Sequence, residues 1–145
     1  METTRYYVDV NLFVYWLGKH PIFGETAHNW IQKIADSSPR EYVTSSLTIY
    51  EALYILAGLA GTNLKDKPFV QQITNSLTQI KGLTIEPLKP EDLTNAAELM
   101  NNNKLDYEDA LHLAVAIRAG AKEIITNDKG FNATNIKKNL LKAPP

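Results

Sequence analysis

The stretch Tyr6-Tyr7-Val8-Asp9-Val10-Asn11 determines how the beginning of the chain folds. Its first three residues favour β-structure and are apolar or aromatic, which predicts a buried strand over 6–8. From Asn11 to Leu17 the apolar residues take helical spacing, and Gly18 marks the end of this helix. A short buried strand followed by a helix is typical of α/β proteins.

The same alternation continues along the chain. Further strands are predicted at 42–44, 83–85, 123–126 and near Ile136, and further helices at about 27–34, 47–59, 69–80, 90–100 and 106–119. We expect Ser46 to cap the helix over 47–59. The sequence has no repeat, linker or low-complexity tract, so residues 1–145 are predicted to form a single domain. This domain is an α/β sandwich whose mainly parallel sheet of four or five strands is flanked by helices.

Composition excludes several classes of protein and site. With 44% hydrophobic and 21% charged residues, the chain is typical of soluble globular domains. The net charge of −1 gives no basic bias of the kind found in many nucleic-acid binders. The absence of cysteine excludes disulfides, zinc–thiolate sites and thiol nucleophiles. Neither a secretory leader nor an apolar run of about 20 residues is present, so we expect a cytoplasmic protein without a membrane partner.

Two acids follow predicted strands. Asp9 comes directly after the first strand, and Asp128 comes after the strand at 123–126. Chain segments that leave the carboxyl ends of parallel strands meet in one crevice, so these two side chains are expected to lie close together. Each also has an ordinary explanation, because Asp9 could cap the next helix and Asp128 lies in a turn-forming sequence.

Two further acids lie in apolar helical segments. Glu51 is the only charged residue over 46–62, although a lone glutamate in a helix is usually on the solvated surface. Asp109 shares a helix face with His112, which we expect to be a hydrogen-bonded core residue. A carboxylate on an inward face is costly unless it has a partner. Asp106 is better explained as the cap of this helix.

If the four acids meet, they require cations or protons. Two carboxylates about 4 Å apart repel each other by roughly 4 kcal/mol at an effective dielectric constant near 20. Carboxylate oxygens without thiols or paired histidines favour Mg²⁺ or Mn²⁺ over Zn²⁺. The acids at Asp9, Glu51, Asp109 and Asp128 therefore predict a site for one of these two cations.

With these segments identified, the chain resembles the PIN-domain ribonucleases, most closely the small stand-alone toxins of the VapC type. The matching segments are Tyr7-Val8-Asp9-Val10-Asn11, Tyr50-Glu51-Ala52-Leu53, Asp109-Ala110-Leu111-His112-Leu113-Ala114 and Thr126-Asn127-Asp128-Lys129-Gly130-Phe131. Their order and spacing fit the family, and the resemblance covers nearly the whole chain. It implies a Rossmann-like three-layer sandwich and an endoribonuclease that depends on Mg²⁺ or Mn²⁺.

The resemblance also implies roles for individual residues and partners. The catalytic, metal-binding set would be the four acids named above, supported by Thr126 through hydrogen bonding, by Asn11 at the edge of the site and by Asp106 as an additional acid. Lys129, next to Asp128, is the expected contact for an RNA phosphate. A toxin of this type would have RNA as its substrate, a cognate antitoxin as a partner and a second copy of itself in a homodimer.

Three other functions fit parts of the sequence. A phosphatase of the haloacid dehalogenase type also has an aspartate after its first strand, but it expects a second one where this chain has Asn11. A receiver domain expects paired acids before its phosphorylated aspartate, and the segment up to Arg5 contains only Glu2. The third is a catalytically silent PIN-fold binding module. Its partner groove could involve the aromatic residues over 13–16 or the helix from Tyr50 to Leu59, which could instead be ordinary core.

Overall fold

The protein is represented by a computed structural model that describes residues 4–127, apart from the side chains of 102 and 103, and the backbone of 137–139. One five-stranded sheet runs through it in the order β3-β2-β1-β4-β5, and all its neighbouring strands are parallel. The strands are β1 (Tyr6–Val8), β2 (Tyr42–Ser45), β3 (Leu83–Glu86), β4 (Glu123–Ile125) and β5 (Lys137–Asn139). The predicted strands and the parallel sheet are therefore confirmed.

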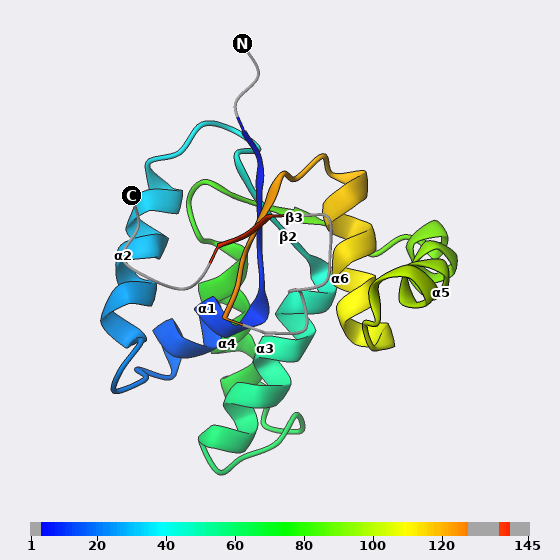
Figure 1. The fold of residues 1–145 in the computed structure, drawn as a ribbon. Helices are drawn as coiled ribbons and strands as arrows, with labels where there is room; N and C mark the ends of the chain where they lie inside the picture. Colours follow the sequence, from blue (N-terminus) through cyan, green and yellow to red (C-terminus); the bar gives the residue numbers. More distant parts are fainter. Residues whose placement is uncertain (1–3, 128–136, 140–145) are drawn as a thin grey trace.

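Helices cover both faces of the sheet, as Figure 1 shows. They are α1 (Val10–Leu17), α2 (Gly24–Ala35), α3 (Ser46–Leu59), α4 (Lys67–Thr78), α5 (Pro90–Asn103) and α6 (Tyr107–Arg118). Alternate strand residues enter different cores: Val8 and Ile125 pack with α1 to α4, whereas Tyr7 and Ile124 pack with α5 and α6. The result is the three-layer sandwich that the sequence predicted. None of the described helices is long and apolar enough to span a bilayer.

The beginning of α3 differs from the prediction. Ser45, the last residue of β2, keeps an extended backbone and caps α3, because its Oγ accepts a hydrogen bond from the Leu47 N–H at 3.0 Å. Ser46 is already helical, and its Oγ accepts from the Leu88 N–H at 3.0 Å. The prediction that Ser46 is the cap was wrong because β2 continues into α3 without a connecting loop.

Arg118 connects the end of α6 to the beginning of α5. Its guanidinium donates to both carboxylate oxygens of Asp92, at 2.9 and 3.0 Å, and to the Pro87 carbonyl at 2.7 Å. It also lies 3.4 Å from Glu86, which pairs with Arg40. The Asp92 side chain is 0% exposed, so its charge depends on this contact for compensation.

Replacing Arg118 by methionine is expected to lower the free energy of unfolding by about 3 kcal/mol, because it leaves Asp92 buried and unpaired. Burial raises the pKa of Asp92, but the hydrogen bonds and charge of Arg118 outweigh burial and hold it below its usual value. A lowered pKa stabilises the fold above about pH 4, and this stabilisation disappears as the pH falls through the lowered value. The free energies of unfolding of the wild type and Arg118→Met, measured in urea, should therefore differ less in acid than at pH 7.

The double variant Arg118→Met/Asp92→Asn provides the control for this prediction. It removes both charges and leaves an oxygen that can accept from the Lys89 N–H, as Asp92 does at 2.8 Å. We expect it to recover much of the lost stability. A loss of equal size at acidic and neutral pH would contradict the electrostatic explanation.

Candidate metal-binding site

Asp9 lies at the carboxyl end of β1, where the sheet pairing extends one residue beyond the strand. Its N–H donates to the Ile125 carbonyl at 3.1 Å, which brings Asp9 beside Thr126 at the end of β4. Thr126 then donates its hydroxyl to Asp9 Oδ2 at 2.6 Å, and Asp9 Oδ1 accepts from the Val10 N–H at 2.8 Å. Asp9 therefore caps α1 and also lies at the junction of two central strands.

The environment of Asp9 does not favour its charged form. The side chain is buried, which raises the pKa of its carboxyl, although the positive charge of His112 and the hydrogen bonds from Thr126 and Val10 oppose this effect. Asn11 lies alongside and donates to Thr126 Oγ1 at 3.4 Å. Its own Oδ1 is buried and accepts no hydrogen bond from any described residue. The site thus contains an oxygen that still needs a partner.

Glu51 is buried, and its partner is His112. Nε2 of His112 lies 2.6 Å from Glu51 Oε1, and Nδ1 lies 2.6 Å from the hydroxyl of Tyr7, which is 3.5 Å from Thr48 Oγ1. Burial disfavours both charges, but the shared hydrogen bond lowers the pKa of Glu51 and, together with the charge of Asp9, raises that of His112. The two groups therefore form an ion pair that fixes the Glu51 carboxylate.

Three acids lie close to this pair: Asp106, directly before α6, and Glu108 and Asp109 in the first turn of α6. Asp106 caps α6 as predicted, because its Oδ1 accepts from the Asp109 N–H at 2.8 Å. Asp109 is half-buried, and its negative charge raises the pKa of His112. Glu108 was not among the predicted site residues; a hydrogen bond with Glu51 and the partial burial of its exposed side chain raise the pKa of Glu108 to about 7. A hydrogen bond between two carboxyl groups requires a proton.

Three of the four predicted acids, Asp9, Glu51 and Asp109, lie near enough to His112 for their charges to raise its pKa. Asp128 and Lys129 lie outside the described residues. His112 is the predicted hydrogen-bonded core residue, but it also links Glu51 to the other acids. Tyr7 was assigned only to a strand, and the sequence offered no signal for its contact with His112.

Whether these side chains fit a metal depends on the donor atoms present. Within residues 4–127, no group of three or more Asp, Glu or His side chains has the geometry of a metal site. The chemistry does fit, because all the acids offer carboxylate oxygens and Asn11 Oδ1 is an unpaired acceptor. A divalent cation could also take the place of the proton between Glu51 and Glu108.

Comparison with known protein families gives a match over residues 6–137, to the family described as PIN domain. No curated protein sequence matches the chain.

Among solved structures, VapBC2 from Rickettsia felis, bound to a promoter DNA fragment, is 21% identical with a TM-score of 0.66, covering 94% of this chain and 98% of that one. VapC20 from Mycobacterium tuberculosis, a toxin that cleaves the sarcin-ricin loop, is 16% identical with a TM-score of 0.67. The match covers 91% of this chain and 98% of VapC20. A chain of a toxin–antitoxin complex from Klebsiella pneumoniae is 21% identical with a TM-score of 0.61. The match covers 86% of this chain and 88% of that one. At these identities the likeness concerns the fold.

Proposed function

Since the chain belongs to the PIN domain family, we propose that it is an endoribonuclease dependent on Mg²⁺ or Mn²⁺ and the toxin of a toxin–antitoxin pair. One observation supports this proposal: the buried His112 bonds to Glu51 at 2.6 Å, and the negative charges of Glu51, Asp9 and Asp109, from three separate segments, all raise its pKa. An acidic centre of this kind has no role in stability that apolar residues would not fill better. Carboxylates that can take up a divalent cation are what metal-dependent phosphodiester hydrolysis needs, which supports the proposal.

The residues that would hold the cation are Asp9, Glu51 and Asp109, together with Asp128. Proteins of this family are typically metal-dependent, and the bound cation supplies Lewis-acid chemistry that activates water for attack on phosphorus. Thr126 and the Val10 N–H orient the Asp9 carboxylate, and His112 orients that of Glu51. Because water attacks, and not the ribose 2′-hydroxyl, cleavage leaves a 5′-phosphate and a 3′-hydroxyl.

The test is to incubate the purified protein with RNA in Mg²⁺, in Mn²⁺ or in excess EDTA, and to determine the chemistry of the product ends. We expect cleavage only with the cations, and ends that a 5′-phosphate-dependent exonuclease digests. Products ending in 2′,3′-cyclic phosphate would rule out this mechanism. A folded protein that binds RNA or an antitoxin but cleaves no RNA would favour the silent binding module.

An apolar surface on α3 supports a protein partner. Tyr50, Tyr54 and Leu59 are 57%, 65% and 69% exposed, and exposed side chains of this size grouped on one helix mark interaction surfaces. The related structures from Klebsiella pneumoniae and Rickettsia felis contain partner proteins or DNA. We propose that these exposed residues of α3 belong to a homodimer interface.

The double variant Tyr54→Asp/Leu59→Asp should convert the homodimer into a monomer, because it places two charges in an apolar interface. Light scattering coupled to gel filtration measures this change directly. Ile22→Asp is the matched control, since Ile22 is 74% exposed but lies between α1 and α2. Equal dimer fractions in the wild type and the double variant would remove α3 from the interface.

A further inference from the structure

Tyr7 is a core residue of β1 with a polar group, its hydroxyl, that packing alone does not need. The side chain is 0% exposed, and the hydroxyl lies 2.6 Å from Nδ1 of His112. On the other side of the same imidazole, Nε2 lies 2.6 Å from Oε1 of Glu51. The hydroxyl of Tyr7 is therefore linked to the Glu51 carboxylate through the imidazole of His112.

The chemistry of the groups determines which atom donates in each of these bonds. An ionised carboxylate only accepts hydrogen bonds, so the N–H at Nε2 of His112 donates to Glu51. If the imidazole carries one proton, Nδ1 accepts from the Tyr7 hydroxyl; if it carries two, Nδ1 donates to the hydroxyl. Burial raises the pKa of the Tyr7 hydroxyl, so it keeps its proton and can take either role. Tyr7 thus fits both forms of His112 in one orientation of the ring.

Tyr7 is itself held in place at the junction of β2 and α3. Thr48 Oγ1 lies 3.5 Å from its hydroxyl, and hydrogen bonding to Thr48 and Ser45 partly opposes the effect of burial on the Tyr7 pKa. Both residues are buried, and Thr48 belongs to the helix that carries Glu51. The rings of Tyr7 and His112 also pack edge to face, with centroids 5.8 Å apart. The imidazole is therefore fixed from the Tyr7 side as well as from the Glu51 side.

We propose that Tyr7 is a positioning residue: through His112, its hydroxyl holds the Glu51 carboxylate in the orientation that binds a divalent cation. This inference rests on the proposed function, because it requires a cation at Glu51. Hydrogen-bonding partners that orient a metal ligand typically contribute about 10- to 100-fold in metal affinity or activity. Phenylalanine at position 7 keeps the ring but leaves Nδ1 of His112 without this partner, and a buried polar atom without a partner is costly. Neither the imidazole nor the carboxylate is then held in one orientation.

The first test examines Tyr7→Phe without metal, as the full-length chain in excess EDTA at one fixed pH. The chain has three histidines, so the imidazole nitrogen signals can be assigned in a nitrogen-15 NMR spectrum. We expect the Nδ1 signal of His112 to move, because this atom loses its hydrogen bond, while the signals of His20 and His28 stay in place. Unchanged His112 signals would overturn the proposal, since the hydroxyl would then have no influence on the imidazole.

The second test measures the Mg²⁺ affinity of Tyr7→Phe by calorimetric titration. We expect binding about tenfold weaker than in the wild type. The Mg²⁺ concentration that gives half-maximal RNA cleavage should rise by a similar factor, while KM for RNA at saturating Mg²⁺ stays unchanged. A role in packing alone would lower the melting temperature without changing the Mg²⁺ affinity, and that result would also overturn the proposal.

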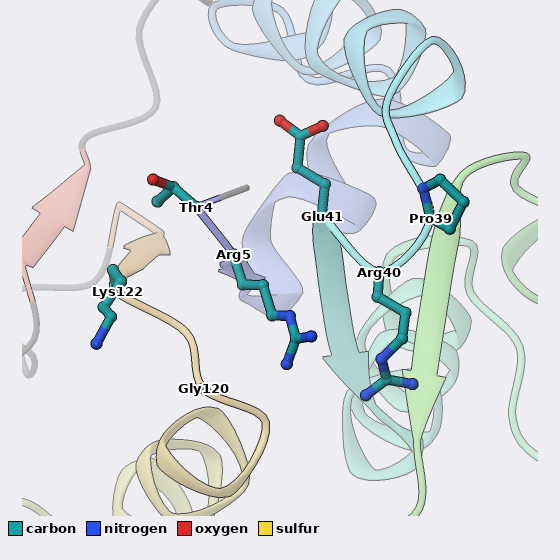
Figure 2. Close-up of a pocket in the computed structure, with 7 residues that line it drawn as sticks. All are labelled: Thr4, Arg5, Pro39, Arg40, Glu41, Gly120 and Lys122. Carbon is teal, nitrogen blue, oxygen red and sulfur yellow. The ribbon is translucent and has the colours of Figure 1, made fainter. Parts of the chain in front are cut away.

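Tyr42 provides the matched control, since it is a second buried tyrosine on a central strand. It lies at the edge of the sheet opposite to the acids, directly after Glu41, which lines a cavity of about 420 Å³ together with Arg40 (Figure 2). Tyr42→Phe removes the same hydroxyl from a ring of the same size. It should keep the wild-type Mg²⁺ affinity and the wild-type signals of His112. Equal weakening by both substitutions would remove the special role of Tyr7.

Thr48→Val is a second variant that leaves Tyr7 whole. Valine has nearly the shape of threonine, and the bond that it removes is long, so Mg²⁺ binding should weaken by roughly two- to threefold. If Tyr7→Phe does not fold, this variant decides the outcome. Wild-type Mg²⁺ affinity in every folded variant would overturn the role of Tyr7 and leave the proposed function standing. A wild-type protein that binds no Mg²⁺ would overturn both.

Discussion

Asp9→Asn is expected to lower the rate of RNA cleavage at least about 100-fold while leaving the fold intact. Asparagine is as good a helix cap as aspartate, so the hydrogen bond from the Val10 N–H can remain. Its amide also has the size of the carboxylate that accepts from Thr126. What the substitution removes is the negative charge. Cleavage of a labelled RNA in Mg²⁺ measures the loss, and an unchanged far-UV circular dichroism spectrum shows that the helices remain.

The chain provides a closely matched control for this substitution. Asp66 caps α4 through a hydrogen bond from the Phe69 N–H at 3.2 Å and accepts from the Thr62 hydroxyl at 2.8 Å. It thus repeats the contacts of Asp9, one helix N–H and one threonine, at a place away from the acidic site. Asp66→Asn should keep full cleavage activity. If both variants lose activity equally, the effect is structural and Asp9 is not part of a metal site.

Binding of the cation gives this prediction a second readout. Mg²⁺ should raise the melting temperature of the wild-type protein and of Asp66→Asn, because a ligand that binds only the folded state stabilises it. The shift should be smaller in Asp9→Asn. An equal shift in all three proteins would place the bound Mg²⁺ elsewhere.

The parts of the site that follow from local sequence were predictable. Asp9 follows a strand of three residues, and the cap at Asp106 follows from its spacing to Asp109. In both cases the pattern within one segment determines the position of the side chain. Glu51 was a candidate as the only charge in an apolar helix, but that pattern left open whether its side chain is buried.

The parts that depend on contacts between distant segments were not predictable. Tyr7 and His112 are 105 positions apart, and nothing in an apolar strand shows that the hydroxyl of Tyr7 meets an imidazole. Arg118 likewise reaches Asp92, 26 positions earlier, only because α5 and α6 pack together. Glu108 lies beside two predicted acids and looks like one more solvated charge at the beginning of a helix. Its bond with Glu51 appears only when α3 and α6 are placed.

Glu108 leads to the second large effect, a pH dependence of cation affinity. Its hydrogen bond with Glu51 and its burial raise its pKa to about 7, so below pH 7 a proton lies between the two carboxyl groups. A cation bound to Glu51 must displace this proton. If about one proton leaves for each cation bound, Mg²⁺ affinity falls roughly tenfold for each pH unit below 7. Calorimetric titration of Mg²⁺ between pH 5.5 and 8, values chosen to bracket the pKa of about 7, should show this slope.

The same proton affects the stability of the metal-free protein in the opposite direction. A carboxyl with a raised pKa stabilises the fold below its unfolded value of about 4.3, and this contribution is lost as the pH rises through the folded value near 7. Mg²⁺ should therefore raise the melting temperature most at the upper end of this range, where the proton has left. Affinity and stabilisation should rise together with pH.

Glu108→Gln should abolish most of this pH dependence. The glutamine amide donates permanently to Glu51, as the protonated carboxyl does, so Mg²⁺ binding should be weak and nearly flat from pH 5.5 to 8, the range set by the pKa of about 7. Glu98→Gln, on the exposed surface of α5, is the control and should retain the wild-type slope. If Glu108→Gln keeps that slope, the displaced proton belongs to another group. His112 would then be the first candidate, because its pKa is raised by Glu51, Asp9 and Asp109.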